Sequence, residues 1–350
     1  MTKKTVVFFG SFLHYSTKVL ESLLQSPYIE IVGAVTTPPA LVSTREQGGS
    51  ASKQNILKNT HTHEYAKQKG ISVFTPENLF ETDPATVFKT PTTDSSLPST
   101  LQKIRPEFFI VAGYGKMLPE SWLSYPTIAS LNLHFSMLPD FRGANPAEWA
   151  ILLGEVETGV SLITMSRDFD TGNLLTRLPL PISEDDTRET LYERLYDLAG
   201  QIAKDSIPHL DSVAFADPQE ISNKPYAYRF NRSHGFIDWA FIKAALDGHS
   251  IKDPLPLLSK HLKTAWEYLY QNPSESEGLI TPEVFLERVV RALAGFPGVW
   301  TYVPTKEGKK RLKVLSTIWD EGILTLDQVQ MEGQNPARFN EIKNQIVDYS

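Results

Sequence analysis

Short apolar runs alternate with helical segments over the first half of the chain, and this alternation restricts the fold more than any other feature. Val6–Phe9 ends at Gly10, a helix is expected over 17–24, and the β-branched run Ile29–Val35 follows. This is the spacing of a βαβ unit, in which a helix joins two parallel strands. Further strands are expected at 71–74, 108–112, 129–134 and 160–165, and further helices at 61–69, 147–153 and 188–207. The sequence therefore predicts an α/β unit with a mainly parallel sheet.

The pattern changes after about Pro208. Residues 211–228 have the composition of a linker, and 240–280 show little alternation and are interrupted by prolines. A helix is expected over 283–294. Beyond it follow short apolar runs separated by charged or glycine-containing turns, at 300–303, 312–317 and 323–329. Such spacing is typical of a small, mostly antiparallel β-barrel.

The composition excludes several classes of chemistry. The chain has no cysteine, so disulfides, thiolate catalysis and cysteine-ligated zinc are excluded. His61 and His63 lie two residues apart without a third ligand nearby, so we expect solvated histidines and no metal site. No apolar run approaches the ~18 residues of a membrane span, and the first run is too short for a signal sequence. We therefore expect a cytoplasmic protein with no membrane partner.

The loop after the first strand contains a single glycine. Phe9-Gly10-Ser11-Phe12 lacks the three glycines of the dinucleotide fingerprint, and no P-loop lysine follows. NAD or ATP binding is therefore not expected here. Because ligands of α/β folds bind at the carboxyl ends of parallel strands, we expect Gly10 and Ser11 to border the site.

Residues suited to acid–base chemistry lie at two further strand ends. Asn132 and His134 are two residues apart, so their side chains share one face of the strand, about 7 Å apart along the chain. An amide and an imidazole among apolar residues are costly unless they are used or satisfied, and a hydrogen-bonded core histidine is the alternative interpretation. Asp170 follows the strand at 160–165. It either forms a structural turn or orients the imidazole and takes a proton.

Longer motifs surround these residues. In the first half they are Phe8-Phe9-Gly10, Ala112-Gly113-Tyr114-Gly115-Lys116-Met117-Leu118-Pro119, Asn132-Leu133-His134-Phe135-Ser136-Met137-Leu138-Pro139, Arg142-Gly143-Ala144, Trp149-Ala150-Ile151, Gly154-Glu155-Val156-Glu157-Thr158-Gly159-Val160 and Asp170-Thr171-Gly172. In the second half they are Ile237-Asp238-Trp239, Arg291-Ala292-Leu293, Phe296-Pro297-Gly298 and Val329-Gln330-Met331-Glu332-Gly333-Gln334-Asn335-Pro336. In this order the motifs resemble those of the folate-dependent formyltransferase family over nearly the whole chain.

The resemblance implies a fold and an activity. The expected fold is a Rossmann-like formyltransferase domain over 1–210, a linker over 211–228 and an OB-like C-terminal β-barrel domain of tRNA-binding type over 229–350, with an atypical insertion at about 240–280. The expected activity is transfer of a formyl group from the co-substrate 10-formyltetrahydrofolate to the amino group of initiator methionyl-tRNA, with no metal.

The resemblance also implies roles for individual residues. Asn132 and His134 would donate hydrogen bonds to the tetrahedral oxyanion, while Asp170 would keep His134 protonated and help a water carry the amine proton away. The folate would contact Ser136, Met137, Leu138, Pro139, Gly115, Lys116, Met117, Leu118, Phe169 and Thr171. The acceptor would contact Gly10, Ser11, Arg45, Arg142, Lys309, Lys310 and Arg311.

The charge distribution leaves the acceptor open. A formal net charge of −7 argues against attraction of nucleic acid to the whole surface, and we expect no DNA partner, but it is compatible with a local basic patch. The loop over 38–59, which is basic in the tRNA enzymes of the family, here holds only Arg45, Lys53 and Lys58 as cations. Residues 82–98 form a further insertion. The basic cluster 306–313 either contacts phosphates or is a solvated hairpin turn.

Three other functions compete with transfer to RNA. The first is N-formylation of a nucleotide-linked amino sugar, which the weakly basic loop favours slightly. The second is hydrolysis of formyl-folate with water as acceptor. The third is a non-enzymatic RNA-binding module, and the intact Asn132, His134 and Asp170 argue against it.

Overall fold

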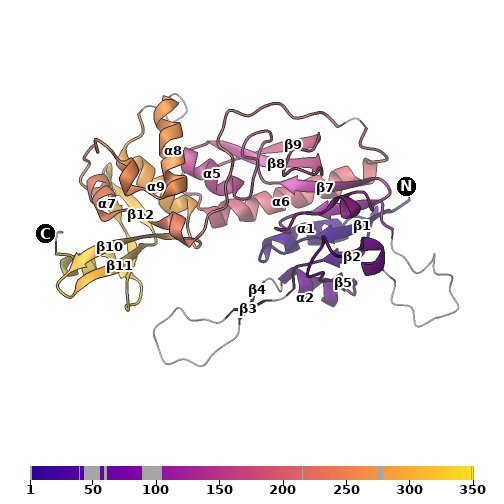
Figure 1. The fold of residues 1–350 in the computed structure, drawn as a ribbon, viewed down its shortest axis with the longest axis horizontal. Helices are drawn as coiled ribbons and strands as arrows, with labels where there is room; N and C mark the ends of the chain where they lie inside the picture. The colour runs from indigo at the N-terminus through magenta and orange to yellow at the C-terminus, as the bar shows by residue number, and fades with distance from the viewer. Residues whose placement is uncertain are drawn as a thin grey trace. The chain divides into compact units, whose positions relative to one another are not determined.

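The computed structural model describes residues 2–38, 40–42, 56–58, 61–88, 105–214, 216–273, 279–347 and 349. The chain forms two compact units, each assembled from separate segments (Figure 1). The first unit comprises 1–142, 159–180 and 193–222, and the second comprises 143–158, 181–192 and 223–350. Among the described residues, every helix is too short or too polar to cross a membrane.

A seven-stranded sheet forms the centre of the first unit. Its strands are β1 Lys4–Phe9, β2 Ile29–Val35, β5 Val73–Phe74, β6 Phe108–Val111, β7 Ala129–His134, β8 Glu157–Thr164 and β9 Leu174–Pro181. They lie in the order β5-β2-β1-β6-β7-β8-β9, and the pairings from β5 to β7 are parallel, whereas β7 and β8 are antiparallel. The predicted α/β class with a mainly parallel sheet is confirmed.

Strand β9 was not predicted from the sequence. Its run Leu174–Pro181 contains two prolines, and most of its side chains are partly or fully exposed. Proline cannot donate to a strand ladder and is tolerated mainly at sheet edges. Because β9 is the last strand of the sheet, the prolines are accommodated there.

Helices and a short ribbon complete the first unit. They are α1 Tyr15–Leu24, α2 His61–Gln68, α3 Pro84–Val87, α4 Glu120–Leu123, α6 Arg188–Ser206 (which begins in the second unit), η1 Ile207–His209, and the antiparallel strands β3 Ala40–Val42 and β4 Ile56–Lys58. The segment 38–59 was expected to be a loop. Of this segment the structure describes residue 38 and the two short strands β3 and β4. The candidate acceptor residue Arg45 and the rest of this segment lie outside the described residues, as does 89–98 of the second insertion.

An aromatic core supports the strand ends that carry the candidate site. Phe9 of β1 contacts Phe109 of β6 at 4.8 Å between ring centroids, and Trp122 and Phe88 pack on the same cluster. Each of these side chains is essentially inaccessible to solvent, and complete burial of such a side chain contributes about 1.5–3 kcal/mol. This packing fixes the register of β1, β6 and β7, so their carboxyl ends meet at one edge of the sheet.

The second unit combines four longer helices with antiparallel strands. Its helices are α5 Pro146–Leu153, η2 Arg232–Gly235, α7 Trp239–Leu246, η3 Leu255–Leu257, α8 Lys260–Gln271, α9 Pro282–Ala292, α10 Phe339–Ile342 and η5 Lys343–Gln345. Its strands are β10 Val299–Thr305, β11 Gly308–Val314, β12 Thr317–Asp320, β13 Ile323–Leu326, β14 Gln328–Met331 and β15 Ala337–Arg338. A four-stranded sheet β10-β11-β14-β15 and the ribbon β12-β13 make the predicted antiparallel β region, which is confirmed.

The segment 240–280 contains two helices that the sequence interpretation missed. The side chain of Asp238 caps α7 by accepting from the backbone N–H of Ala240 at 2.9 Å. Helix α8 buries Leu262, Trp266 and Leu269, which follow helical spacing. The prolines that interrupted the pattern lie outside both helices: Pro254 and Pro256 lie at and within η3, and Pro273 follows α8.

Candidate active site

Two polar side chains project from β7 where the strand ends. Asn132 pairs with Val111 of β6 and with Ile163 of β8, and His134 pairs with Ser161 of β8. Asn132 is half-buried and His134 is only 4% exposed. Both side chains reach Asp170, so the prediction that they share one face of the strand is confirmed.

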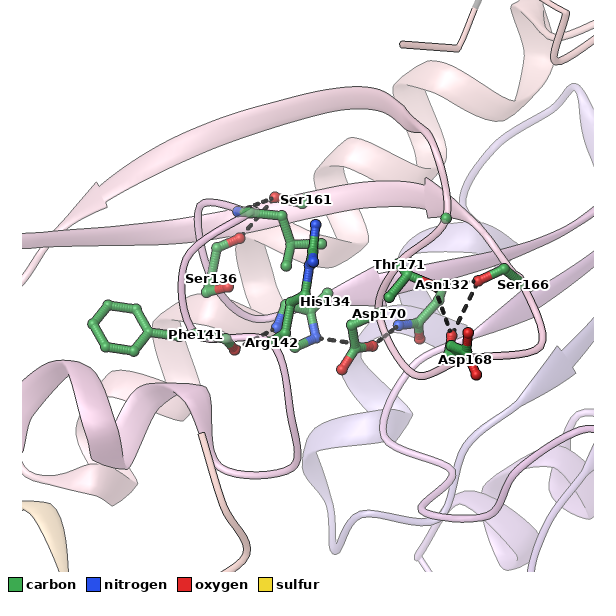
Figure 2. Close-up of polar contacts among 12 residues, drawn as sticks. Asn132, His134, Ser136, Phe141, Arg142, Ser161, Ser166, Asp168, Asp170 and Thr171 are labelled. Carbon is green, nitrogen blue, oxygen red and sulfur yellow. Dashed lines mark hydrogen bonds and ion pairs between the residues drawn. The ribbon is translucent and has the colours of Figure 1, made fainter. Parts of the chain in front are cut away.

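Asp170 lies in the turn between β8 and β9 (Figure 2). Its Oδ1 lies 3.3 Å from Nδ2 of Asn132 and 3.4 Å from Nδ1 of His134. Both distances are long for N–H···O hydrogen bonds, which cluster near 2.9–3.0 Å. Asp170 has a φ of 55°, in the left-handed region that aspartate enters more readily than most residues. Two N–H groups thus point loosely at one oxygen position.

The surroundings of His134 favour its charged form. Its Nε2 donates to the carbonyl oxygen of Phe141 at 3.0 Å, and Nδ1 faces the carboxylate of Asp170. Both ring nitrogens thus face acceptors, and only the imidazolium has an N–H group for each of them. Burial alone disfavours the charge, but the charge of Asp170, its hydrogen bond and the Phe141 carbonyl outweigh burial and raise the pKa of His134 above 6.5. The nearby cation Arg142 opposes this effect.

The turn after His134 is held by a serine of β8. Ser161 Oγ donates to the carbonyl oxygen of Ser136 at 2.7 Å and accepts from the backbone N–H of Leu138 at 3.0 Å. The hydroxyl of Ser136 donates to the carbonyl of Asp140 at 2.6 Å, and Arg177 donates to the carbonyl of Leu138 at 2.5 Å. The turn therefore has a fixed backbone.

Several other predicted site residues lie in the first unit's loops. Met137 and Pro139 are half-buried in the same turn, while Phe169 is 53% exposed in the Asp170 turn. Thr171 Oγ1 lies 2.8 Å from the hydroxyl of Ser166 and also donates to the carbonyl of Asp168 at 3.2 Å. The exposed aromatic ring thus belongs to a turn whose backbone is tied internally.

The loop after β6 combines an anchor with accessible backbone. Leu118 is buried in the aromatic core, and Lys116 donates to the carbonyl of Glu77 at 3.1 Å. Gly115 has a φ of 76° with no heavy atom within 4 Å of a built Cβ, and Met117 is 39% exposed. This loop can therefore present backbone groups to a ligand while its base stays fixed.

Gly10 and Ser11 follow β1 and are bound within the fold. Ser11 Oγ accepts from the backbone N–H of Thr37 at 2.7 Å, and its own N–H donates to Gly113 at 3.1 Å. A Cβ at Gly10 would meet Phe8 at 2.6 Å, so the glycine is required for close packing. These two residues shape the end of β1.

Of the predicted acceptor residues that the structure describes, Gly10, Ser11 and Arg142 belong to the first unit and the others to the second. The guanidinium of Arg142 is bound by Gln219 rather than standing in an open cleft. Lys309, Lys310 and Arg311 lie on β11 of the second unit. On that strand Lys309 and Arg311 are exposed, whereas Lys310 is turned to the other side and pairs with Glu307. Within the described ranges, no group of three or more His, Asp or Glu side chains could hold a metal ion.

Sequence interpretation did not single out the residues that hold the site in place. Ser161 was treated as an ordinary strand residue, and Gln219 fell in the segment expected to be a linker. Their hydrogen bonds depend on tertiary contacts with 136–138 and 170–172, which no local periodicity reveals.

An α/β sheet with an amide and an imidazole at the end of β7, and a carboxylate that reaches both and favours the charged imidazole, is the arrangement of an enzyme that uses acid–base chemistry and charge stabilisation. Residues 4–207 match the family described as formyl transferase. The chain belongs to this formyl transferase family, and the predicted resemblance is confirmed.

Curated relatives extend the comparison. The methionyl-tRNA formyltransferase of Caldanaerobacter subterraneus subsp. tengcongensis is 31% identical over 235 residues, 67% of this chain and 69% of the relative. That of Staphylococcus epidermidis is 26% identical over 316 residues, 88% of this chain and 94% of the relative. The crystal structure of a 4-N formyltransferase from Francisella tularensis aligns with a TM-score of 0.50 and 10% identity, covering 87% of this chain and 95% of that one, which supports the fold alone.

Proposed function

We propose that this protein transfers a formyl group from 10-formyltetrahydrofolate to the free amino group of initiator methionyl-tRNA, for the initiation of translation. The observation that carries the proposal is the similarity to relatives of that name, which extends over 88% of the chain and so includes most of the second unit. The chemistry at the end of β7 agrees with it, because moving an activated formyl group needs positioning and charge stabilisation.

Asn132 and His134 stabilise the intermediate in this proposal. The amine nitrogen attacks the formyl carbon, and the carbonyl oxygen becomes an oxyanion in the tetrahedral intermediate. Nδ2 of Asn132 and Nδ1 of His134 both lie within 3.4 Å of Oδ1 of Asp170, and because both contacts are long, each N–H group can be shared between that carboxylate and an oxyanion beside it. Removing one such donor typically costs about 3–4 kcal/mol in the barrier.

Asp170 keeps the imidazole charged and assists proton removal. The attacking amine must lose a proton, and the bond from the formyl carbon to N10 of the folate breaks as N10 gains one. A water next to the carboxylate of Asp170 accepts the amine proton, while the raised pKa of His134 favours its protonated form. The contacts of Asn132 and His134 with Asp170 are long, and they can shorten when substrate binds.

The folate donor is assigned to the loops that surround this centre. The turn Ser136–Pro139 has a backbone fixed by Ser161, the loop 115–118 offers accessible backbone, and Phe169 is an exposed ring beside Asp170. A pterin needs flat apolar contact and a few placed backbone hydrogen bonds, which these loops supply together. No metal takes part in the proposed transfer.

The acceptor is assigned to RNA because of one face of the second unit's sheet. Lys309, Arg311 and Lys313 alternate along β11, and β10 places Tyr302 opposite Arg311 and Trp300 opposite Lys313. Directly opposite residues share a face of an antiparallel pair, so cations and aromatic rings lie together there. Tyr302 is 48% exposed. Cations beside exposed rings suit phosphates and stacked bases.

Competition between acceptors tests the proposal. The purified protein is given 10-formyltetrahydrofolate with charged initiator tRNA and a nucleotide-linked amino sugar together. Formylated methionyl-tRNA as the main product is expected, and the double variant Arg311→Glu/Lys313→Glu should raise the KM for tRNA without changing the KM for the donor. Formylation of the sugar, with no effect of the double variant, would replace the proposed acceptor by the amino sugar.

A further inference from the structure

The segment after α6, expected to be a linker, lies against the two loops that hold His134's partners. Asp217 exchanges backbone hydrogen bonds with Leu174 at the start of β9, at 2.7 and 2.9 Å. Five residues later, Ser222 donates to Oδ1 of Asp140 at 2.5 Å. The chain between these two points is therefore fixed at both ends, and Gln219 lies between them.

The side-chain amide of Gln219 uses its full hydrogen-bonding capacity. Nε2 donates to the carbonyl oxygens of Asp170 at 2.9 Å and Gly172 at 2.6 Å. Oε1 accepts from Nε and Nη2 of Arg142, at 2.9 and 2.7 Å. An amide offers two donors and two acceptor lone pairs, and here each is used. The reverse orientation would direct the NH2 group of Gln219 at a guanidinium, so the contacts determine which atom of the amide is Oε1 and which is Nε2.

These contacts reach the catalytic imidazole from both sides. On one side, Asp170 is the partner of Nδ1 of His134. On the other, Arg142 directly follows Phe141, whose carbonyl accepts from Nε2. Gln219 therefore binds the backbone of Asp170 and the side chain of Arg142, which is the residue after Phe141.

We propose that Gln219 is a positioning residue for formyl transfer: it holds the Asp170 turn and the Arg142 side chain so that Asp170, and not Arg142, sets the charge of His134. The proposal rests on the function proposed above. It assigns no contact between Gln219 and either substrate.

Charge and backbone geometry give the expected direction of the effect. The charged groups that face His134 are Asp170, which favours the imidazolium, and Arg142, which opposes it. Without the amide, the Asp170 turn loses two donors to its carbonyls while its φ of 55° still carries strain, so the carboxylate is less well held. Arg142 loses its side-chain acceptor at the same time. Both changes lower the pKa of His134.

The main variant is Gln219→Met, which keeps side-chain length and removes every hydrogen bond. We expect kcat to fall by about 10- to 100-fold, the range that follows from misplacing a catalytic group by ~1 Å. The KM values for donor and tRNA should change less than about twofold, because the amide touches neither substrate. The alkaline limb of the kcat–pH profile should move to lower pH. The control Gln201→Met, at an exposed position of α6, should behave as wild type.

A double-mutant cycle and a direct titration separate positioning from a merely structural role. In an Asp170→Asn background, Gln219→Met should change kcat less than about twofold, since the group it positions is gone. NMR titration of the His134 ring in ligand-free protein should show a lower pKa in Gln219→Met than in wild type. Multiplicative effects in the cycle, or an unchanged His134 titration in a folded variant, would overturn the proposal. An inactive wild-type protein whose His134 titration still responds to Gln219→Met would instead refute the proposed function alone.

Discussion

Substituting Gly172 by alanine should disable the site through backbone displacement alone. Gly172 closes the Asp170 turn against the end of β8, and a Cβ built there would lie 1.6 Å from the carbonyl oxygen of Thr164. Real Cβ atoms essentially never approach a heavy atom within 3.0 Å, so the turn must retreat by 1.4 Å, the difference between these two distances. The neighbouring strand cannot yield easily, because Thr164 pairs with Leu131 of β7.

The cost follows from the distance that the turn must move. Asp170 Oδ1 is already 3.4 Å from Nδ1 of His134, and a shift of this size takes it beyond hydrogen-bonding range. Misplacement of a catalytic group by ~1 Å can cost about 100-fold in rate, and overpacking of this kind costs about 1–3 kcal/mol in the free energy of unfolding. We therefore expect Gly172→Ala to retain its fold and to lose at least about 100-fold in kcat.

Steady-state formylation and urea denaturation measure the two effects. Gly248→Ala is the matched control, because Gly248 has a φ of 65° and no atom within 4 Å of a built Cβ, so it adds only backbone strain of about 1–2 kcal/mol. The control should lose stability and keep its kcat. Gly172→Ala with a kcat within threefold of wild type would show that the Asp170 turn can move without consequence, and would refute the reasoning.

Further predictions concern a catalytic donor, a histidine pair and a buried ion pair. His134→Asn should lower kcat by about 100- to 1000-fold while the dissociation constant of the folate, measured by fluorescence quenching, changes little. Burial, with a smaller contribution from His234, lowers the pKa of His261 to about 4, so between pH 6.5 and 4 the unfolded chain binds a proton that the folded chain does not. Stability should therefore fall by about 2 kcal/mol from pH 7.5 to 5, and urea titrations of His261→Gln should lack this loss. Glu148→Gln should cost about 3–5 kcal/mol in thermal or urea unfolding, because the buried charge of Arg188 would no longer face the carboxylate that lies 2.6 Å from it.

Those parts of the fold that rest on local pattern were predictable from the sequence. The strands before Gly10 and around Asn132 are short apolar runs in the sequence. Most of their side chains are buried in the structure, which is why an apolar run predicted each strand. The sharing of one face by Asn132 and His134 followed from strand alternation. The contact of Asp170 with His134 was one of two interpretations of its place after the strand at 160–165, the other being a structural turn.

The remaining features depend on position in the tertiary structure. Prolines hid β9, which tolerates them only because it lies at the sheet edge. Lys309 and Lys310 were grouped as one basic cluster, but strand alternation turns Lys310 away from the exposed face. Gln219 acts through four hydrogen bonds to residues 47 to 77 positions away in sequence, which composition cannot indicate.

The most direct test of the central claim is transfer of a labelled formyl group by the purified protein. 10-Formyltetrahydrofolate carrying the label is mixed with charged initiator methionyl-tRNA, with charged elongator methionyl-tRNA, or with no acceptor. The account predicts label on the amino group of initiator methionyl-tRNA, little on the elongator, and no release of formate without acceptor. Formate released at the same rate in all three mixtures, or no labelled RNA from a protein that binds the folate, would contradict it.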